Sequence, residues 1–266
     1  MFKKVIFLAL LVPCFIFSKD VKSRLTIITL TSPAACNPRT ILLEISQHSL
    51  YKNIPNFSEI PKLIAFDGVK NPADEPNYNA YKKKVEELVK SHPHFKNTKL
   101  LYCKEHGHYS GLLKEALKYI RTEYAYIHQE DLMLLQPIDL HGLLDAMDLN
   151  HNIKFVRFND GLNTLGKSNA CDCYIDDYIA GGSAFPLLRT YGFGDHDQIS
   201  RKDYYEQTIF PYIGDVKMFP DGIMMGKVAG DCQQDSSLHL KWGTYLYGGY
   251  GAGPFIQHLD RKSVVW

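Results

Sequence analysis

Four side chains that can bind metals or transfer protons stand together at the end of an apolar segment. In "YAYIHQEDLMLL", residues 124–127 are followed by His128, Gln129, Glu130 and Asp131, and apolar residues then resume. Carboxylates bind hard divalent cations, and carboxylates and imidazoles act as general acids and bases. An acidic residue at this point can also cap a helix. The cluster therefore predicts either a cation site or a helix cap.

A second group of ionisable side chains lies in "GFGDHDQIS", where Asp195, His196 and Asp197 follow two glycines. A carboxylate in such a turn can take the proton of a hydroxyl group, which is the task of a general base. Asp195 and Asp197 are the two candidates for that base. Paired carboxylates also serve hydrolases, and the sequence offers a further pair at Asp176 and Asp177.

The elements that position these side chains follow from the spacing of apolar residues. Residues 24–33 and 61–69 are typical of strands, and a helical pattern follows each of them. "TKLLYCKEHGHYS" is a short strand running into a turn, "SGLLKEALKYIRTEY" is an amphipathic helix, and the strand before His128 comes next. This alternation predicts an α/β fold with a mainly parallel central sheet flanked by helices.

Polar side chains follow the predicted strands at the points where the strands end. They are Ser32 with Pro33, Asp67, Gly107 and the segment 129–131. The carboxyl ends of parallel strands meet at one edge of a sheet, and ligands bind there. The sequence therefore predicts a ligand site that collects these loops.

The second part of the chain has a different composition. After residue 150 it is rich in Tyr, Gly and Asp, with one more strand in "NIKFVRFN" and few clear helices apart from 201–209. No linker separates the two parts, so we predict a single domain over residues 24–266.

The amino terminus has the layout of a secretory signal peptide. Lys3 and Lys4 precede an apolar run over residues 5–17, which is shorter than the roughly 20 residues that span a bilayer. We expect a signal peptide over residues 1–18, with an uncleaved anchor or a buried first strand as the alternatives. The predicted location is the lumen of the secretory pathway, the outside of the cell or the envelope, with a membrane tether in the case of an anchor.

The charge of the chain is close to balanced, with 30 Lys and Arg against 29 Asp and Glu. Proteins that bind nucleic acid through its phosphates concentrate positive charge. Nucleic acid is therefore not an expected partner.

The strand order, with "LIAFDGV" and "HGHYSGLLKEALKYIRTEYAYIHQED", resembles the GT-A glycosyltransferases, most clearly over residues 24–136. In that family a carboxylate after the second strand contacts the nucleotide base, and a later strand ends in a metal-binding Asp-x-Asp motif. The resemblance implies a nucleotide-sugar half at 24–136 and an acceptor half at 150–266. It also implies a UDP- or GDP-sugar donor, a glycan, protein or lipid acceptor, and Mn²⁺ or Mg²⁺ as cofactor.

The resemblance implies a role for each candidate residue. A divalent cation would stabilise the negative charge that develops on the leaving diphosphate. This chain has Gln129-x-Asp131 in place of Asp-x-Asp, and His128-x-Glu130 is the other alignment. By this resemblance the donor-binding residues are Ser32, Pro33, Asp67, Gly107, Ser110 and Gln129, the metal ligands are Asp131 and His258, and the base is Asp195 or Asp197.

Two other classes of function stay open. The missing first aspartate of the motif favours a secreted carbohydrate-binding protein on a decayed transferase scaffold, and the carboxylate pairs favour a metal-dependent hydrolase. Individual residues also have structural alternatives, since Asp67-Gly68 fits an ordinary turn and His258 fits a structural histidine.

Overall fold

The computed structural model describes residues 20–164, 175–178 and 185–259. The expected leader, residues 1–18, lies outside this part, and so do the side chains of Asp176 and Asp177. Across the described residues, no helix is both long enough and apolar enough to cross a membrane.

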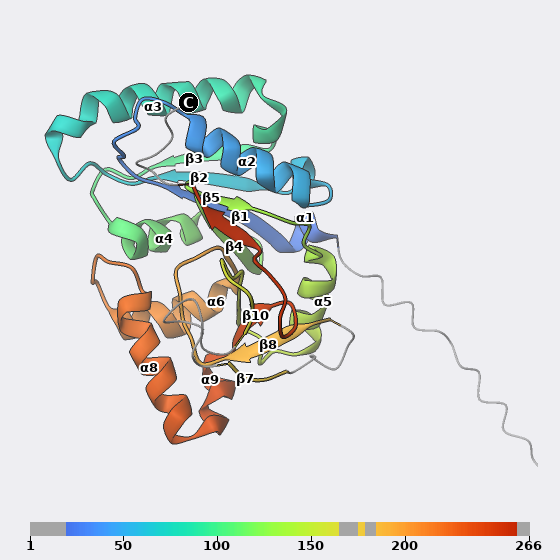
Figure 1. Ribbon diagram of the computed structural model, residues 1–266. Coiled ribbons are helices and arrows are strands. Elements are labelled where there is room, and N and C mark those ends of the chain that lie inside the picture. The colour runs from blue at the N-terminus through green and yellow to red at the C-terminus, as the bar shows by residue number, and fades with distance from the viewer. Residues whose placement is uncertain (1–19, 165–174, 179–184, 260–266) are drawn as a thin grey trace, which may run out of the picture.

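A nine-stranded sheet forms the centre of the molecule, with strands in the order β3-β2-β1-β4-β9-β6-β10-β8-β7. Figure 1 shows β1 to β4 of this sheet between the flanking helices. Neighbouring strands from β3 to β4 are parallel, whereas β9 and β8 run against the other strands. The predicted α/β fold with a mainly parallel sheet is confirmed. The strands are β1 (Leu25–Thr31), β2 (Lys62–Phe66), β3 (Thr98–Tyr102), β4 (Tyr124–Gln129), β6 (Phe155–Arg157), β7 (Ile175–Tyr178), β8 (Leu187–Thr190), β9 (Gln198–Arg201) and β10 (Thr244–Tyr247).

Helices cover both faces of the sheet. Figure 1 shows α2 and α3 on one side, and α4 and α8 on the other. Successive side chains of a strand point to opposite faces, so Leu25 and Ile27 of β1 pack with α2, while Ile28 and Leu30 pack with α4. The strand is apolar throughout because both of its faces are buried. The longer helices are α2 (Ile41–Asn53), α3 (Glu75–Ser91), α4 (His108–Lys118), α5 (Leu140–Leu149) and α8 (Asp221–Gln234).

A separate two-stranded sheet returns the end of the chain to the "HQED" segment. In it β5 (Leu132–Leu134) pairs antiparallel with β11 (Ile256–His258), and His258 lies opposite Leu132. The backbone N–H of Leu259 donates to the carbonyl oxygen of Asp131 at 2.6 Å. This pairing places His258 beside the turn that joins β4 to β5.

The second part of the chain uses shorter elements. The helix expected at 201–209 is present as α6 (Lys202–Tyr204) followed by the π-helix η4 (Tyr205–Ile209), and α7 (Phe210–Ile213) continues it. The sequence did not predict α8, because three glycines within it weaken the helical pattern. The remaining short helices are α1 (Val21–Arg24), η1 (Phe57–Glu59), η2 (Pro72–Asp74), η3 (Pro93–Phe95), η5 (Ser236–Leu238) and α9 (His239–Trp242).

Candidate functional site

A cavity of about 430 Å³ opens where β1, β2 and β4 end and α4 begins. Four of the six residues expected to bind a donor line it, namely Ser32, Pro33, Asp67 and Gln129. The structure therefore brings these strand ends together, as expected for a parallel sheet. The other residues that line this cavity, called the donor pocket for its predicted role, include Lys70, His106, His108, Tyr109 and Phe219.

Asp67 is almost fully buried at the wall of the donor pocket. Its Oδ1 accepts the backbone N–H groups of Gly68 at 2.9 Å and Gly107 at 2.7 Å, and its Oδ2 accepts that of His108 at 3.1 Å. The same Oδ2 lies 2.7 Å from Nδ1 of His106. The carboxylate thus joins the end of β2 to the turn before α4, and its contact with a nucleotide base stays a prediction.

Gly107 and Ser110 lie at the edge of this arrangement. Gly107 lines a neighbouring depression of about 350 Å³ between β3 and α4. Ser110 is buried, and its hydroxyl donates to the carbonyl oxygen of Val216 at 2.6 Å, while its N–H donates to that of Met218 at 3.1 Å. These bonds connect the first turn of α4 to the loop before α8, so a donor contact of Ser110 also stays a prediction.

The side chains of the "HQED" segment alternate in direction, as in a strand. Glu130 points toward α3, where its Oε2 accepts the hydroxyl of Tyr81 at 2.7 Å and its Oε1 accepts the N–H of Ser32 at 3.4 Å. His128 is fully buried and points toward α2. The side chains of His128 and Glu130 are thus both hydrogen-bonded inside the protein, and the Gln129-x-Asp131 alignment stays a prediction.

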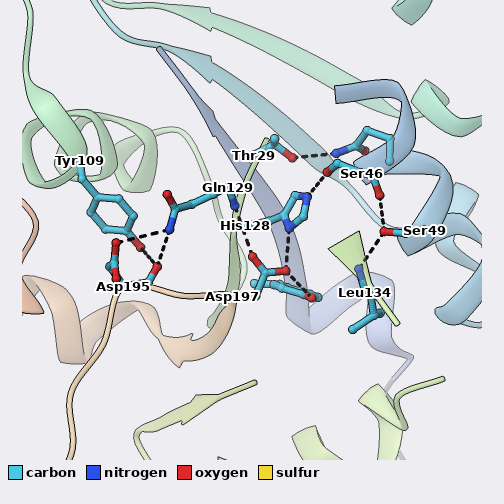
Figure 2. Close-up of polar contacts among 11 residues, drawn as sticks. Thr29, Ser46, Ser49, Tyr109, His128, Gln129, Leu134, Asp195 and Asp197 are labelled. Atoms are coloured by element: carbon cyan, nitrogen blue, oxygen red, sulfur yellow. Dashed lines mark hydrogen bonds and ion pairs between the residues drawn. The ribbon is translucent and has the colours of Figure 1, made fainter. Parts of the chain in front are cut away.

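Gln129 connects the donor pocket to the turn before β9 (Figure 2). Its Nε2 donates to the carbonyl oxygen of Asp195 at 3.1 Å and approaches Oδ2 of the same residue at 3.4 Å. The hydroxyl of Tyr109 donates to that carbonyl as well, at 3.3 Å. Asp195 is half-buried beside the pocket, held by two residues that line it.

Asp197 differs from Asp195 because it is fully buried. Its Oδ2 accepts the hydroxyl of Tyr126 at 3.0 Å and Nδ1 of His128 at 2.7 Å, and its Oδ1 accepts the N–H of Gln129 at 3.3 Å. Of the two candidates for the base, Asp195 is the one with a partly accessible side chain.

Two titratable side chains near Asp195 have shifted pKa values. Burial lowers the pKa of His196, and the nearby Arg157 lowers it further. Burial raises the pKa of Asp221, and the charge of Asp195 adds to that effect. Both shifts favour the uncharged forms of these two side chains.

The two expected metal ligands lie at the same edge of the molecule. Asp131 forms the turn after β4, and the exposed His258 has its ring 5.3 Å from that of His196. Within the described residues, no three His, Cys, Asp or Glu side chains converge as a ligand group. Mg²⁺ commonly uses one or two carboxylates together with substrate phosphates and water. The residues present fit a cation that enters with a diphosphate, rather than a complete protein cage.

Several residues of the site were not assigned to it from the sequence. His106 lies in the turn before α4, and His108 and Tyr109 are the first two residues of that helix; their position shortly after a strand was the only sequence signal. Phe219 and Asp221 come from the loop before α8 and its first residue, and no local pattern marked them.

No protein-family profile and no curated protein matches this sequence. Solved structures do match it. S. aureus TarS superposes with a TM-score of 0.54 at 14% identity, over 88% of this chain and 36% of that one. TarS in complex with UDP-GlcNAc superposes with a TM-score of 0.54 at 11% identity, over 91% of this chain and 61% of the TarS chain. The complex of TarS with UDP superposes with a TM-score of 0.50 at 12% identity, over 88% of this chain and 59% of the TarS chain.

The fold is therefore a GT-A-like glycosyltransferase fold. This chain spans between about a third and three-fifths of the length of the TarS chains that it matches. At these identities the likeness concerns the fold, and the roles of individual residues depend on the geometry above.

Proposed function

We propose that the protein is a glycosyltransferase that moves a sugar from a UDP- or GDP-sugar to a glycan, protein or lipid acceptor. The observation that carries the proposal is the position of Gln129 in a GT-A-like fold. Its side chain lines the donor pocket and also holds Asp195, so a donor binding site and a candidate base share one residue. The likeness to TarS, which binds UDP-GlcNAc in its crystal structure, supports the same donor class.

The donor would bind with its nucleotide between the Ser32-Pro33 loop and the start of α4. Lys70 at the pocket brings a positive charge, and His106 and His108 bring further N–H donors. Such groups suit the negative charge of a diphosphate. The ring of Phe219 lies edge-on to that of His108, at 4.8 Å between centroids, and adds an apolar wall.

Asp131 and His258 would hold Mn²⁺ or Mg²⁺ at the end of β4. The cation would neutralise charge on the diphosphate as the bond to the sugar breaks. Gln129 would accompany it by contacting a hydroxyl group of the sugar or ribose.

Asp195 would act as the base. It would take the proton of the acceptor hydroxyl while the acceptor oxygen bonds to the sugar and the nucleoside diphosphate leaves. Gln129 and Tyr109 hold the backbone of Asp195 from the donor side, so the carboxylate is held close to where the sugar would lie.

The site of action would be the lumen of the secretory pathway, the cell exterior or the envelope. This rests on the charge and apolar pattern of residues 1–18. Amino-terminal sequencing of the protein recovered from its natural host would test it: a start near residue 19 supports a cleaved leader, and an intact Met1 supports an anchor or a first strand.

A carbohydrate-binding protein is the second candidate. It is favoured by Gln129, which stands in place of a metal-binding carboxylate. A metal-dependent hydrolase has less support, because Asp197 is enclosed and cannot form an accessible pair with Asp195.

Calorimetric titration of UDP and GDP, with and without Mn²⁺, separates these functions. The matched variants are Asp131→Ala and, as a control, Asp215→Ala, whose side chain is 97% exposed. Mn²⁺-dependent binding that is lost in Asp131→Ala and kept in the control supports the transferase. If neither nucleotide binds to the folded protein, the proposal fails for these donors, and binding of glycans without metal would support the second candidate.

A further inference from the structure

A chain of buried polar groups connects α2 to the turn that carries Asp195 (Figure 2). The hydroxyl of Ser46 bonds to Nε2 of His128, and Nδ1 of His128 lies 2.7 Å from Oδ2 of Asp197. The residue types and their order are those of a serine hydrolase triad. All three residues have 0% exposure, so no substrate can reach the serine. The buried Ser46–His128–Asp197 chain therefore has a role other than hydrolysis.

The role follows from the point at which the backbone pairing of β4 with β9 ends. The backbone pairing of β4 with β9 ends at Ile127 and Gln198. Beyond that point, side chains make the connection: Oδ1 of Asp197 accepts the N–H of Gln129 at 3.3 Å, and the amide of Gln129 donates to the carbonyl oxygen of Asp195 at 3.1 Å. Asp197 thus continues the connection between the two strands past the last backbone pair.

A carboxylate in the interior is tolerated only when it is well hydrogen-bonded. Asp197 receives three donors, from Tyr126, His128 and the backbone of Gln129. Removal of either carboxylate oxygen would leave buried donors without an acceptor, and the turn would have to move to satisfy them.

We propose that Asp197 is a positioning residue. Together with His128 and Ser46 it fixes the end of β4 against the turn 195–197, so that Asp195 lies beside Gln129 at the donor pocket. The consequence for catalysis rests on the proposed transferase function, whereas the positioning itself does not.

Two variants and one control test the proposal. Asp197→Asn keeps the size of the side chain but replaces an acceptor with a donor, and Ser46→Ala removes the far end of the chain. Ser49→Ala is the matched control. Ser49 lies on the same helix and is also buried, but its hydroxyl contacts the carbonyl oxygen of Ser46 at 2.6 Å and the N–H of Leu134 at 2.9 Å.

The first measurement is amide hydrogen exchange of the full chain without ligand, over residues 124–130 and 194–201. Exchange in both segments should rise about tenfold in Asp197→Asn and Ser46→Ala, the change expected from one lost buried bond, and stay near the wild-type rate in Ser49→Ala. If hydrogen exchange is unchanged in both Asp197→Asn and Ser46→Ala, the proposal that these residues position the turn is wrong. If Asp197→Asn does not fold, the result for Ser46→Ala decides.

The second measurement separates this inference from the proposed function. With a donor that the wild type binds, both variants should keep a Kd within about threefold while turnover falls about tenfold or more. Full turnover in Ser46→Ala with a loss in Asp197→Asn alone would assign Asp197 a direct role as base and refute the shared positioning. If exchange rises in the variants but the wild type binds no donor, the positioning role of Asp197 is supported and the proposed transferase function is rejected.

Discussion

The two halves of the sheet hold their candidate site residues by different means. In the half predicted to bind the donor, called the donor half, β1 to β4 form an unbroken parallel ladder joined by helices of 13, 17 and 11 residues. In the half predicted to bind the acceptor, called the acceptor half, β6 and β9 have only 3 and 4 residues, and strand directions are mixed. Residues at the ends of the parallel ladder are placed by backbone geometry, whereas Asp195 depends on individual side-chain bonds. The acceptor half should therefore be the more sensitive to single polar changes that leave donor binding intact.

The largest effect is expected for Asp195→Asn. Loss of a general base typically lowers turnover by about 10²–10⁴-fold, while the Kd for the nucleotide should stay within about threefold. Steady-state turnover and calorimetry measure the two quantities, and Asp215→Asn is the control because its side chain is exposed. A loss of nucleotide affinity in Asp195→Asn would break the comparison, since Asp195 would then belong to the donor half.

The next largest effect is the loss of stability at low pH, through a histidine in the acceptor half. His239 is buried, its Nε2 donates to the carbonyl oxygen of Thr244 at 2.8 Å, and burial lowers its pKa to about 4. The fold favours the neutral ring, whose pKa in the unfolded chain is about 6.5. The contribution of His239 to the free energy of unfolding is therefore fully present above pH 6.5. It is lost as the pH falls toward 4, by on the order of 3 kcal/mol in total.

Urea unfolding of the wild type and of His239→Gln at pH 7.5 and pH 4.5 measures this contribution. The wild type should lose about 2–3 kcal/mol more than the variant between the two values, because glutamine does not titrate. Equal losses in the two proteins would show that His239 is not the group responsible.

A smaller effect is expected in the donor half, where backbones approach closely. A Cβ on Gly68 would lie 2.2 Å from the carbonyl carbon of Glu105. Gly68→Ala should therefore destabilise the protein by about 1–3 kcal/mol and weaken nucleotide binding at the Asp67 wall. Unfolding curves and calorimetry measure both, and wild-type values for the two would contradict the close packing of this turn.

The smallest effect has the opposite sign and lies in the acceptor half. Gly226 is inside α8, and nothing lies within 4 Å of a Cβ placed there. Gly226→Ala should stabilise the protein by about 0.4–1 kcal/mol, because alanine has less freedom to lose on folding. The same unfolding curves measure it. A loss of stability would contradict the open space around Gly226.

The sequence predicted the donor half far better than the acceptor half, for a physical reason. The elements from β1 to β4 repeat apolar residues at the period of a strand or a helix, and the strand ends alone locate Ser32, Asp67 and Gln129. Asp195 reaches Gln129 only because β9 inserts between β4 and β6, and the polar segment "DHDQIS" contains no local sign of that pairing. Ser46 gave no signal either, since a serine inside a helix has no pattern that reveals a partner 82 residues away.

The pairing of β11 with β5 also has a consequence for biosynthesis. The strand that brings His258 beside Asp131 leaves the ribosome after the residues that line the donor pocket, which lie between positions 30 and 129 together with Phe219. A nascent chain can form the parallel ladder early and fold as its amino-terminal elements emerge. The edge beside Asp131 is complete only when residues 256–258 arrive, so a chain cut short before them would carry the pocket without His258 beside Asp131.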